Sequence, residues 1–282
     1  MPETHSSEIR VAMRPPFGER LALPSGYELH YLESGSGFPV VLLHGSGPGA
    51  SAYSNFKQNA PALAGAGLRV LLPDMIGFGY SSKPSGIDYT LDLFCTALRD
   101  FLNALGIERC ALIGNSLGGA IALKTAIDEP RRVDKLVLIA PGGIESREAY
   151  FAMPGMQQLV SSFMSAGFDR AGLKCALELL VADPAVITDE LVDERFNILQ
   201  TQPKDVLGRM RIPDLTANLA RIVCPVLGFW GMDDQLMPLG GYEKILRACP
   251  NSRFVMFARC GHWAMVEHAD EFNRYVVDFL KR

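Results

Sequence analysis

The sequence predicts an α/β fold, in which a mainly parallel eight-stranded sheet is covered by helices on both faces and carries an inserted helical segment. Short apolar runs typical of buried strands alternate with longer helical patterns along most of the chain, which indicates a parallel sheet. Between residues 142 and 213 the alternation stops and helix-like patterns take over. A length of 282 residues with 48% hydrophobic content suits one elaborated domain with a large core.

Eight apolar runs are expected to form the strands, at residue 22 with its neighbours and at residues 27–33, 40–43, 69–72, 110–113, 135–139, 226–230 and 253–257. Helical patterns separate most of the later runs, at residues 91–105, 117–128, 241–248 and 270–281. Functional groups in a parallel sheet gather at the carboxyl ends of the strands. The loops that follow the strands are therefore the expected positions of a site.

The interruption predicts a core made of residues 1–141 and 214–282 and a helical lid made of residues 142–213. Pro213 stands just before the strand pattern resumes. Methionine and phenylalanine side chains of the lid either line a pocket or pack the lid against the core. The insertion as a whole favours a covered, apolar pocket.

Ser116 is the first candidate for a catalytic nucleophile. It stands in a Gly-x-Ser-x-Gly segment, 114–118, between an expected strand and an expected helix, which is the context of a nucleophile elbow. A strand that reverses into a helix within three residues forces the serine into a strained conformation, and the flanking glycines leave room for it. The five-residue pattern is weak evidence until a base and an acid can be matched to it.

His262 is the candidate general base, which a serine hydroxyl needs because it is almost wholly protonated at neutral pH. It lies in the loop after the last expected strand and before the last helix. The other histidines suit structural positions: His5 in a polar tail, His30 in a strand and His268 on a polar stretch. Cys260, two residues from His262, is expected to pack rather than to react.

The loop after residues 226–230 offers two adjacent aspartates as the acid that orients the imidazole. Successive side chains on a tight loop point apart, so one of the pair is expected to face His262. We favour Asp234, and Asp233 is the alternative, interpreted as a solvated turn residue. The order of nucleophile, acid and base along the chain is then that of α/β-hydrolases.

A glycine-rich turn, 44–49, follows the strand at residues 40–43 and is a candidate oxyanion hole. The expected donors are the backbone amides of Ser46 and Leu117. His44 is interpreted as a structural residue packed behind the turn, the alternative being a second base. The turn lacks the Gly-Lys-Ser/Thr ending of a phosphate-binding loop, so no nucleotide is expected.

Composition narrows the class further. A net charge of −4 without basic runs argues against nucleic acid and membrane surfaces as partners. Residues 1–19 lack the apolar core of a signal peptide, and no apolar stretch approaches the roughly 20 residues of a membrane span. Six scattered cysteines favour reduced thiols and a cytoplasmic location. We expect no cofactor and no metal.

Several motifs together resemble the meta-cleavage product hydrolases of the α/β-hydrolase superfamily. They are His44-Gly45-Ser46-Gly47-Pro48-Gly49-Ala50, Ser54-Asn55, Gly114-Asn115-Ser116-Leu117-Gly118-Gly119, Gly231 to Pro238, Cys260-Gly261-His262-Trp263 and Glu267-His268-Ala269-Asp270-Glu271-Phe272-Asn273-Arg274. The likeness covers roughly residues 26–282. It is dense around the expected site and loose in the lid, where the stretch 204–216 looks shorter than in the family.

The resemblance implies a set of substrate-binding residues. Asn115 and Trp263 are implied to contact the substrate beside the nucleophile and the base. Asn55 is implied to lie near the dienoate end of the family's substrate, a 2-hydroxy-6-oxohexa-2,4-dienoate. The turn glycines Gly45 and Gly47 are assigned to the same substrate-binding set.

The family also implies an arginine from the lid, and Arg195 best matches it. A guanidinium can hold a substrate carboxylate bidentately. The alternative for Arg195 is a surface ion pair with Glu194 or Asp193.

The implied activity is hydrolysis of a carbon–carbon bond in 2-hydroxy-6-oxohexa-2,4-dienoates, the small-molecule ring-fission products of aromatic degradation. The implied assembly is a homo-oligomer, a dimer or larger. A carboxylesterase or lactonase is the first alternative, since it needs the same triad without the lid arginine. A non-catalytic ligand receptor on the same fold is the second.

Overall fold

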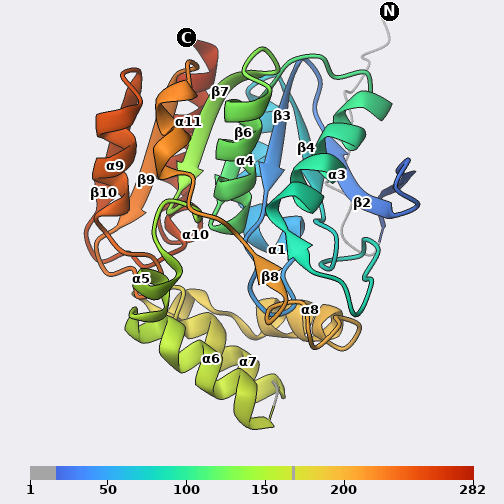
Figure 1. Cartoon of the computed structure of the whole chain (residues 1–282), viewed down its shortest axis with the longest axis vertical. Coiled ribbons are helices and arrows are strands. Elements are labelled where there is room, and N and C mark those ends of the chain that lie inside the picture. Colours follow the sequence, from blue (N-terminus) through green and yellow to red (C-terminus); the bar gives the residue numbers. More distant parts are fainter. Residues whose placement is uncertain (1–16, 167–168) are drawn as a thin grey trace, which may run out of the picture.

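The computed structural model describes residues 17–166 and 169–282. In this part of the chain, eight strands form one sheet in the order β1-β2-β4-β3-β6-β7-β9-β10 (Figure 1). Their bounds are β1 Glu19–Ala22, β2 Glu28–Ser34, β3 Phe38–Leu43, β4 Leu68–Pro73, β6 Cys110–Asn115, β7 Val133–Ile139, β9 Val226–Gly231 and β10 Ser252–Phe257. All eight expected strands are present, and the predicted fold class is confirmed. The predictions that residues 1–19 hold no signal peptide and that His5 lies in a polar tail fall on residues 1–16 wholly or for the most part, outside this description.

The sheet is parallel apart from one strand. β2 pairs antiparallel with both β1 and β4, while the remaining neighbours pair parallel. β6, in the middle, is buried along its whole length, as expected of a strand covered on both faces. The carboxyl ends of β3, β6, β7, β9 and β10 therefore meet at one edge.

The described helices are 4 to 14 residues long. They are α1 Ala52–Phe56, α2 Ala60–Gly65, α3 Leu91–Ala104, α4 Leu117–Asp128, α5 Arg147–Phe151, α6 Pro154–Ala166, α7 Arg170–Glu178, α8 Asp189–Leu199, α9 Gly241–Ala248, α10 Ala264–Glu267 and α11 Ala269–Lys281, with 3-10 turns η1 Pro184–Val186 and η2 Thr216–Arg221. The predictions for α3, α4, α9 and α11 are correct to within one residue. The short helices α1 and α2 were not predicted, because five or six residues give too little periodicity to recognise.

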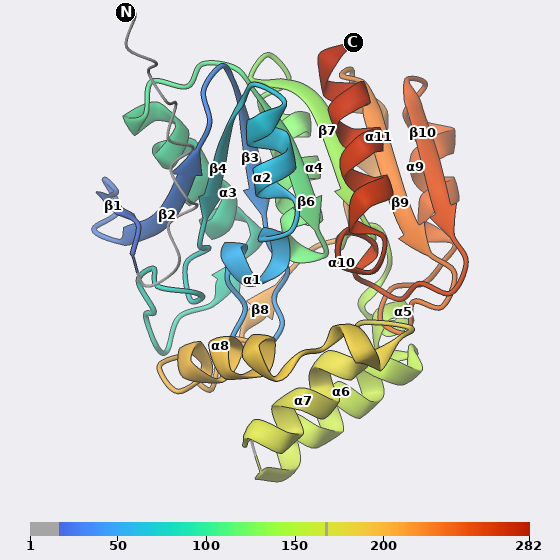
Figure 2. The same cartoon turned by 180° about the vertical axis from the view of Figure 1, so that it is seen from behind.

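Both faces of the sheet are covered. Figure 1 shows α3, α4 and α9 in front of it, and Figure 2 shows α1, α2, α10 and α11 on the other side. α3 illustrates the cause, because its apolar residues at helical spacing, including Leu91, Phe94, Leu98 and Phe101, are all buried. The Thr90 hydroxyl caps this helix by accepting the amide of Leu93 at 3.1 Å.

Helices α5 to α8 lie together beyond the carboxyl ends of the parallel strands (Figure 2). They come from the stretch expected to form a lid. The boundaries at residues 142 and 213 stay a prediction.

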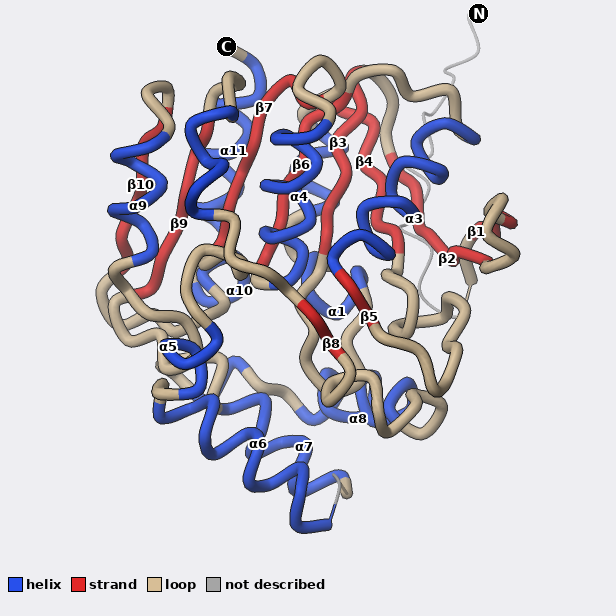
Figure 3. Tube along the Cα trace, viewed as in Figure 1, coloured by secondary structure: helices blue, strands red, loops and turns tan. Residues whose placement is uncertain are grey.

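The stretch is not helical throughout, contrary to the expectation. β8 (Met210–Arg211) pairs in parallel with β5 (Tyr89–Thr90), and Figure 3 shows this small sheet beside the main one. The Arg209 guanidinium donates to the Ile87 carbonyl at 2.6 Å, and the backbone carbonyl of Arg209 accepts the amide of Tyr89. These partners lie about 120 residues apart, so local sequence could not reveal the pairing.

A buried amide pair ties the start of α2 to the C-terminal helix. The Asn59 side chain donates at 2.9 Å to both the Met265 carbonyl and the Asn273 side chain, and Asn273 donates to the Gln58 carbonyl at 3.1 Å. Asn59 is fully buried.

Among the described residues, the helices are too short or too polar to span a bilayer.

Asn59→Ala is expected to lower the free energy of unfolding by about 1–3 kcal/mol, because it leaves buried acceptors without a donor. Urea unfolding followed by circular dichroism measures this, with the exposed Asn218→Ala as control. Equal stability of the two variants would contradict the importance of the pair.

Candidate active site

Ser116 lies between β6 and α4 in a strained turn. Its φ of 54° and ψ of −114° lie outside the usual regions for a residue with a side chain. A β-carbon on Gly118 would lie 2.0 Å from the Leu43 carbonyl oxygen, and one on Gly114 would lie 2.3 Å from that of Gly118. Larger residues cannot occupy these positions, so the sharp turn expected from the sequence is present.

His262 and Asp234 are hydrogen-bonded in the interior. The imidazole Nδ1 donates to Asp234 Oδ2 at 2.8 Å, and the two side chains are 3% and 1% exposed. The other carboxylate oxygen accepts the amides of Leu236 at 2.8 Å and Met237 at 3.0 Å. The acid is thereby held by its own loop and fixes the tautomer of the imidazole.

The adjacent Asp233 is exposed, as its interpretation as a solvated turn residue requires. Its amide donates to the Cys260 carbonyl at 2.9 Å, which joins the acid loop to the base loop. Cys260 itself is buried, and its pKa is raised by burial and by the nearby Glu267 carboxylate. A thiol of this kind packs and is a poor nucleophile.

The glycine-rich turn lies directly against Ser116. A β-carbon on Gly45 would lie 3.3 Å from the Ser116 β-carbon and 3.1 Å from Asn115 Oδ1. Leu117 is the first residue of α4, where a helix leaves its amide without an internal partner. The turn that holds Ser46 and the start of α4 therefore both lie beside Ser116.

His44 has a structural role. Its Nδ1 donates to the Gly45 carbonyl at 2.7 Å, and its Nε2 accepts the amide of Met75 at 2.9 Å. Burial lowers its pKa, so the ring stays neutral. Both nitrogens are used, which excludes the alternative of a second base.

Asp74 supports the chain behind the turn. Its carboxylate accepts the amides of Ala52 at 2.8 Å and Tyr80 at 2.9 Å, and Nδ1 of the buried His30 at 2.8 Å. Burial acts to raise the pKa of Asp74, but the hydrogen bonds from His30 and from the Ala52 amide outweigh it, so the pKa lies below its ordinary value.

Asn115 and Asn55 form a buried amide chain beside the nucleophile. Asn55 donates to Asn115 Oδ1 at 3.2 Å, and Asn115 donates to the carbonyls of Ile139 at 3.2 Å and His262 at 3.5 Å. Within the described residues, Asn55 Oδ1 has no partner. Asn115 thus joins the elbow to the loop that holds His262, while Asn55 Oδ1 remains a buried acceptor without a donor in the described residues.

Arg195 is buried, at 1% exposure, on α8. Its Nε donates to the Pro48 carbonyl at 3.1 Å, and its guanidinium lies 5.2 Å from the centre of the Trp263 ring. A β-carbon on Gly47 would lie 2.9 Å from Nη2, while Nη1 has no partner in the described part of the chain. Burial lowers the pKa of Arg195 to about 10, so the group remains a cation at neutral pH.

The surface ion pair considered for Arg195 is wrong. Glu194 pairs instead with Lys57 at 2.9 Å, and Asp193 pairs with Arg170 at 2.6 Å. Successive residues of a helix point about 100° apart, which sends both carboxylates away from the buried guanidinium.

Two residues that the sequence analysis did not assign hold these loops. The Gln202 side chain accepts the amide of Gly49 at 2.9 Å, and the Glu267 carboxylate accepts the amide of Gly261 at 2.6 Å. Glu267 stands inside one of the motifs that resemble the family, and Gln202 was not singled out. Neither carries a local signal, since each acts on a partner brought close by the fold.

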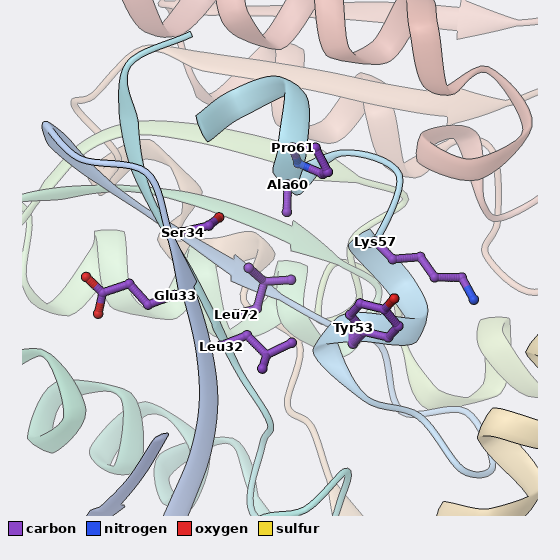
Figure 4. A pocket seen from close by; sticks show the side chains of 8 residues that line it. All are labelled: Leu32, Glu33, Ser34, Tyr53, Lys57, Ala60, Pro61 and Leu72. Atoms are coloured by element: carbon purple, nitrogen blue, oxygen red, sulfur yellow. The ribbon is translucent and has the colours of Figure 1, made fainter. Parts of the chain in front are cut away.

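A hollow away from these groups is too small for a substrate. It lies between β2, β4, α1 and α2, where Figure 4 shows Leu32, Leu72 and Tyr53 around it. Its volume of about 20 Å³ suits a single water molecule.

A family model described as the alpha/beta hydrolase family matches residues 40–275. The 2-hydroxy-6-oxo-6-phenylhexa-2,4-dienoate hydrolase of Comamonas testosteroni is 36% identical over 92% of this chain and 93% of its own. A 2-hydroxy-6-oxononadienedioate/2-hydroxy-6-oxononatrienedioate hydrolase of Paraburkholderia phymatum is 38% identical over 92% of this chain and 93% of its own.

A solved structure of a meta-cleavage product hydrolase from Pseudomonas fluorescens IP01 superposes with a TM-score of 0.82, at 29% identity over 94% of this chain and 97% of that one. The fold and the model match define an α/β-hydrolase. With the curated relatives added, the chain belongs to the meta-cleavage product hydrolases of that family, and the resemblance noted in the sequence is confirmed.

Asp74→Asn is expected to cost about 1–3 kcal/mol of stability at pH 7, since an amide cannot accept all three hydrogen bonds. The pKa of Asp74 is lower in the folded protein than its ordinary value of 3.8, so its contribution is complete above that value and is lost as the pH falls through the folded pKa. The difference between variant and wild type should therefore shrink below about pH 4.

Urea unfolding from pH 3 to 7.5 measures this difference, with the exposed Asp270→Asn as control. A difference that stays constant over the whole range would show that ionised Asp74 does not stabilise the turn.

Proposed function

We propose that this protein hydrolyses the carbon–carbon bond of 2-hydroxy-6-oxohexa-2,4-dienoates, giving 2-hydroxypenta-2,4-dienoate and a carboxylic acid. The observation that carries the proposal is Arg195, a buried cation with an unpaired Nη1 beside the turn at Gly47. An unpaired buried charge is costly unless a ligand anion completes it. The names of the curated relatives supply the class of substrate.

In this proposal Arg195 and Asn55 bind the carboxylate and 2-hydroxy end of the dienoate. The guanidinium offers Nη1, and Asn55 Oδ1 offers an acceptor for the hydroxyl. Trp263 holds the guanidinium plane from one side, and Asn115 aligns Asn55. Gly45 and Gly47 belong to the same proposed substrate site, where a side chain would crowd the elbow or the Arg195 guanidinium.

Ser116, His262 and Asp234 form the proposed catalytic triad. His262 takes part in the proton transfer that ketonises the dienol at carbon five. It then removes the hydroxyl proton of Ser116, which attacks the carbon-six ketone, and Asp234 stabilises the imidazolium. In the alternative form of this step, a water molecule activated by Ser116 attacks the carbon-six ketone.

The tetrahedral intermediate places its oxyanion on the amides of Ser46 and Leu117. The carbon–carbon bond then breaks, because the electron pair is delocalised into the departing dienolate, which is protonated to the pentadienoate. Water hydrolyses the remaining acyl-serine with His262 as base. An esterase would need the same groups but no carboxylate-binding arginine.

The wider setting belongs to the same proposal. Residues 142–213 act as a lid over the site, and the protein acts in the cytoplasm as a homo-oligomer. The lid proposal is supported by the position of α5 to α8 beyond the carboxyl ends of the strands (Figure 2). The six cysteines, all free thiols, support a reducing compartment.

Stopped-flow absorbance of a 6-phenyl and a 6-alkyl 2-hydroxy-6-oxohexadienoate tests the reaction. Wild type should remove the dienolate colour and release the pentadienoate, whereas Ser116→Ala should be slower by at least a thousandfold. Retained colour with both substrates, together with fast cleavage of a p-nitrophenyl ester, would favour a carboxylesterase or lactonase. No turnover of either substrate would favour a ligand receptor.

Arg195→Met is expected to lower kcat/KM for the dienoate by roughly 10- to 100-fold, the value of hydrogen bonds to a charged group. Cleavage of p-nitrophenyl acetate, which has no carboxylate to bind, should change only a few-fold. Arg170→Met, at a half-exposed arginine of α7, is the matched control. Equal losses on both substrates would show that Arg195 does not select the carboxylate.

A further inference from the structure

We infer that Glu267 is a positioning residue for His262, joining the base loop to the segment that follows α7. The inference rests on the proposed function, because the base that Glu267 would place is the one assigned there. Glu267 ends α10, a short helix at the sheet edge near the base loop (Figure 1).

One carboxylate holds amides from two separate parts of the chain. Glu267 Oε2 accepts the amide of Gly261, the residue before His262, at 2.6 Å. Oε1 accepts the amides of Ala182 at 2.7 Å and Asp183 at 3.2 Å. Hydrogen bonds to an ionised acceptor are about twice as strong as neutral ones.

Two further contacts join the same segments, and one of them lies on the other side of His262. The amide of Trp263 donates to the Leu180 carbonyl at 3.1 Å. A β-carbon on Gly261 would lie 2.8 Å from the backbone of Leu180 and Val181, so the two chains touch without room for a side chain.

His262 is therefore held at both neighbours by residues 180–183, whereas its own ring is held by Asp234. The Asp234 hydrogen bond fixes the tautomer and the tilt of the ring. The hydrogen bonds of Glu267 to Gly261, Ala182 and Asp183, called the Glu267 bridge, fix the position of the backbone at His262. The placement of the base thus depends on the docking of a segment that belongs to the proposed lid.

A carboxylate is required because three N–H groups converge on it from two directions. Glutamine has the same size but offers one acceptor, so in Glu267→Gln an NH₂ group faces one of these amides. That variant breaks the bridge without removing volume.

The test measures the rate at which a fluorophosphonate probe labels Ser116 in the full chain. Labelling needs only the activated serine, so it does not depend on which substrate the protein turns over. The variants are Glu267→Gln and Asp270→Asn, the same chemical change three residues away at an exposed position. Hydrogen exchange of the peptides covering 180–183 and 260–263 and thermal unfolding are recorded on each.

Glu267→Gln is expected to label about 10- to 100-fold more slowly, as misplacement of a catalytic group by up to about 1 Å predicts. Both peptides should exchange faster together, while the unfolding temperature changes by only a few degrees and KM for p-nitrophenyl acetate stays the same. Asp270→Asn should behave as wild type.

Wild-type labelling by Glu267→Gln, or faster exchange in only one of the two peptides, would overturn the inference and leave the proposed function intact. A Glu267→Gln protein that unfolds at a much lower temperature but labels normally while folded would show a structural role only. Wild type that does not label at Ser116 would overturn the proposed function and the inference with it.

Discussion

The backbone strain at Ser116 is the constraint on which the rest of the site depends. A positive φ at a residue with a side chain persists only where the surroundings leave no alternative. Here the surroundings are the fully buried β6 on one side and the glycine-lined start of α4 on the other. Because Gly118 touches the Leu43 carbonyl, the same glycine brings the end of β3 against the elbow. The turn that follows β3 has to begin beside the nucleophile.

Asp234 and His262 are brought to this point by the register of the sheet. β9 and β10 pair in parallel, with Gly231 opposite Phe257, so their loops leave the edge together. The absence of a side chain at Gly231 lets the base loop approach, since a β-carbon there would lie 2.1 Å from the Gly261 carbonyl oxygen. Hydrogen bonding between Asp234 and His262 then completes a geometry that the strands have largely fixed.

The features that could be predicted from the sequence are those that a short stretch of chain determines by itself. The elbow around Ser116, the strands and the longer helices each have a pattern of their own. The geometry of a tight loop predicted that only one of the two aspartates faces His262, and the choice of Asp234 rested on the resemblance of its loop to that of α/β-hydrolases. The buried state of Arg195 had no such signal, because its neighbours on α8 are charged and suggest a surface. Its environment comes from Pro48 and Trp263, distant in sequence, and the pairing of β5 with β8 was missed for the same reason.

The close contact between Gly49 and α8 limits how this fold can be rearranged. Gly49 has a φ of 63°, and a β-carbon there would lie 2.0 Å from the Arg195 carbonyl oxygen, while the Lys57–Glu194 ion pair joins α1 to the same helix. The glycine-rich turn and α8 therefore fit each other as a matched surface. Grafting the segment 142–213 of a relative onto this chain would replace α8 and leave the glycine-rich turn without the helix that fits it. A graft that preserves this fit has to include α8 together with residues 47–57.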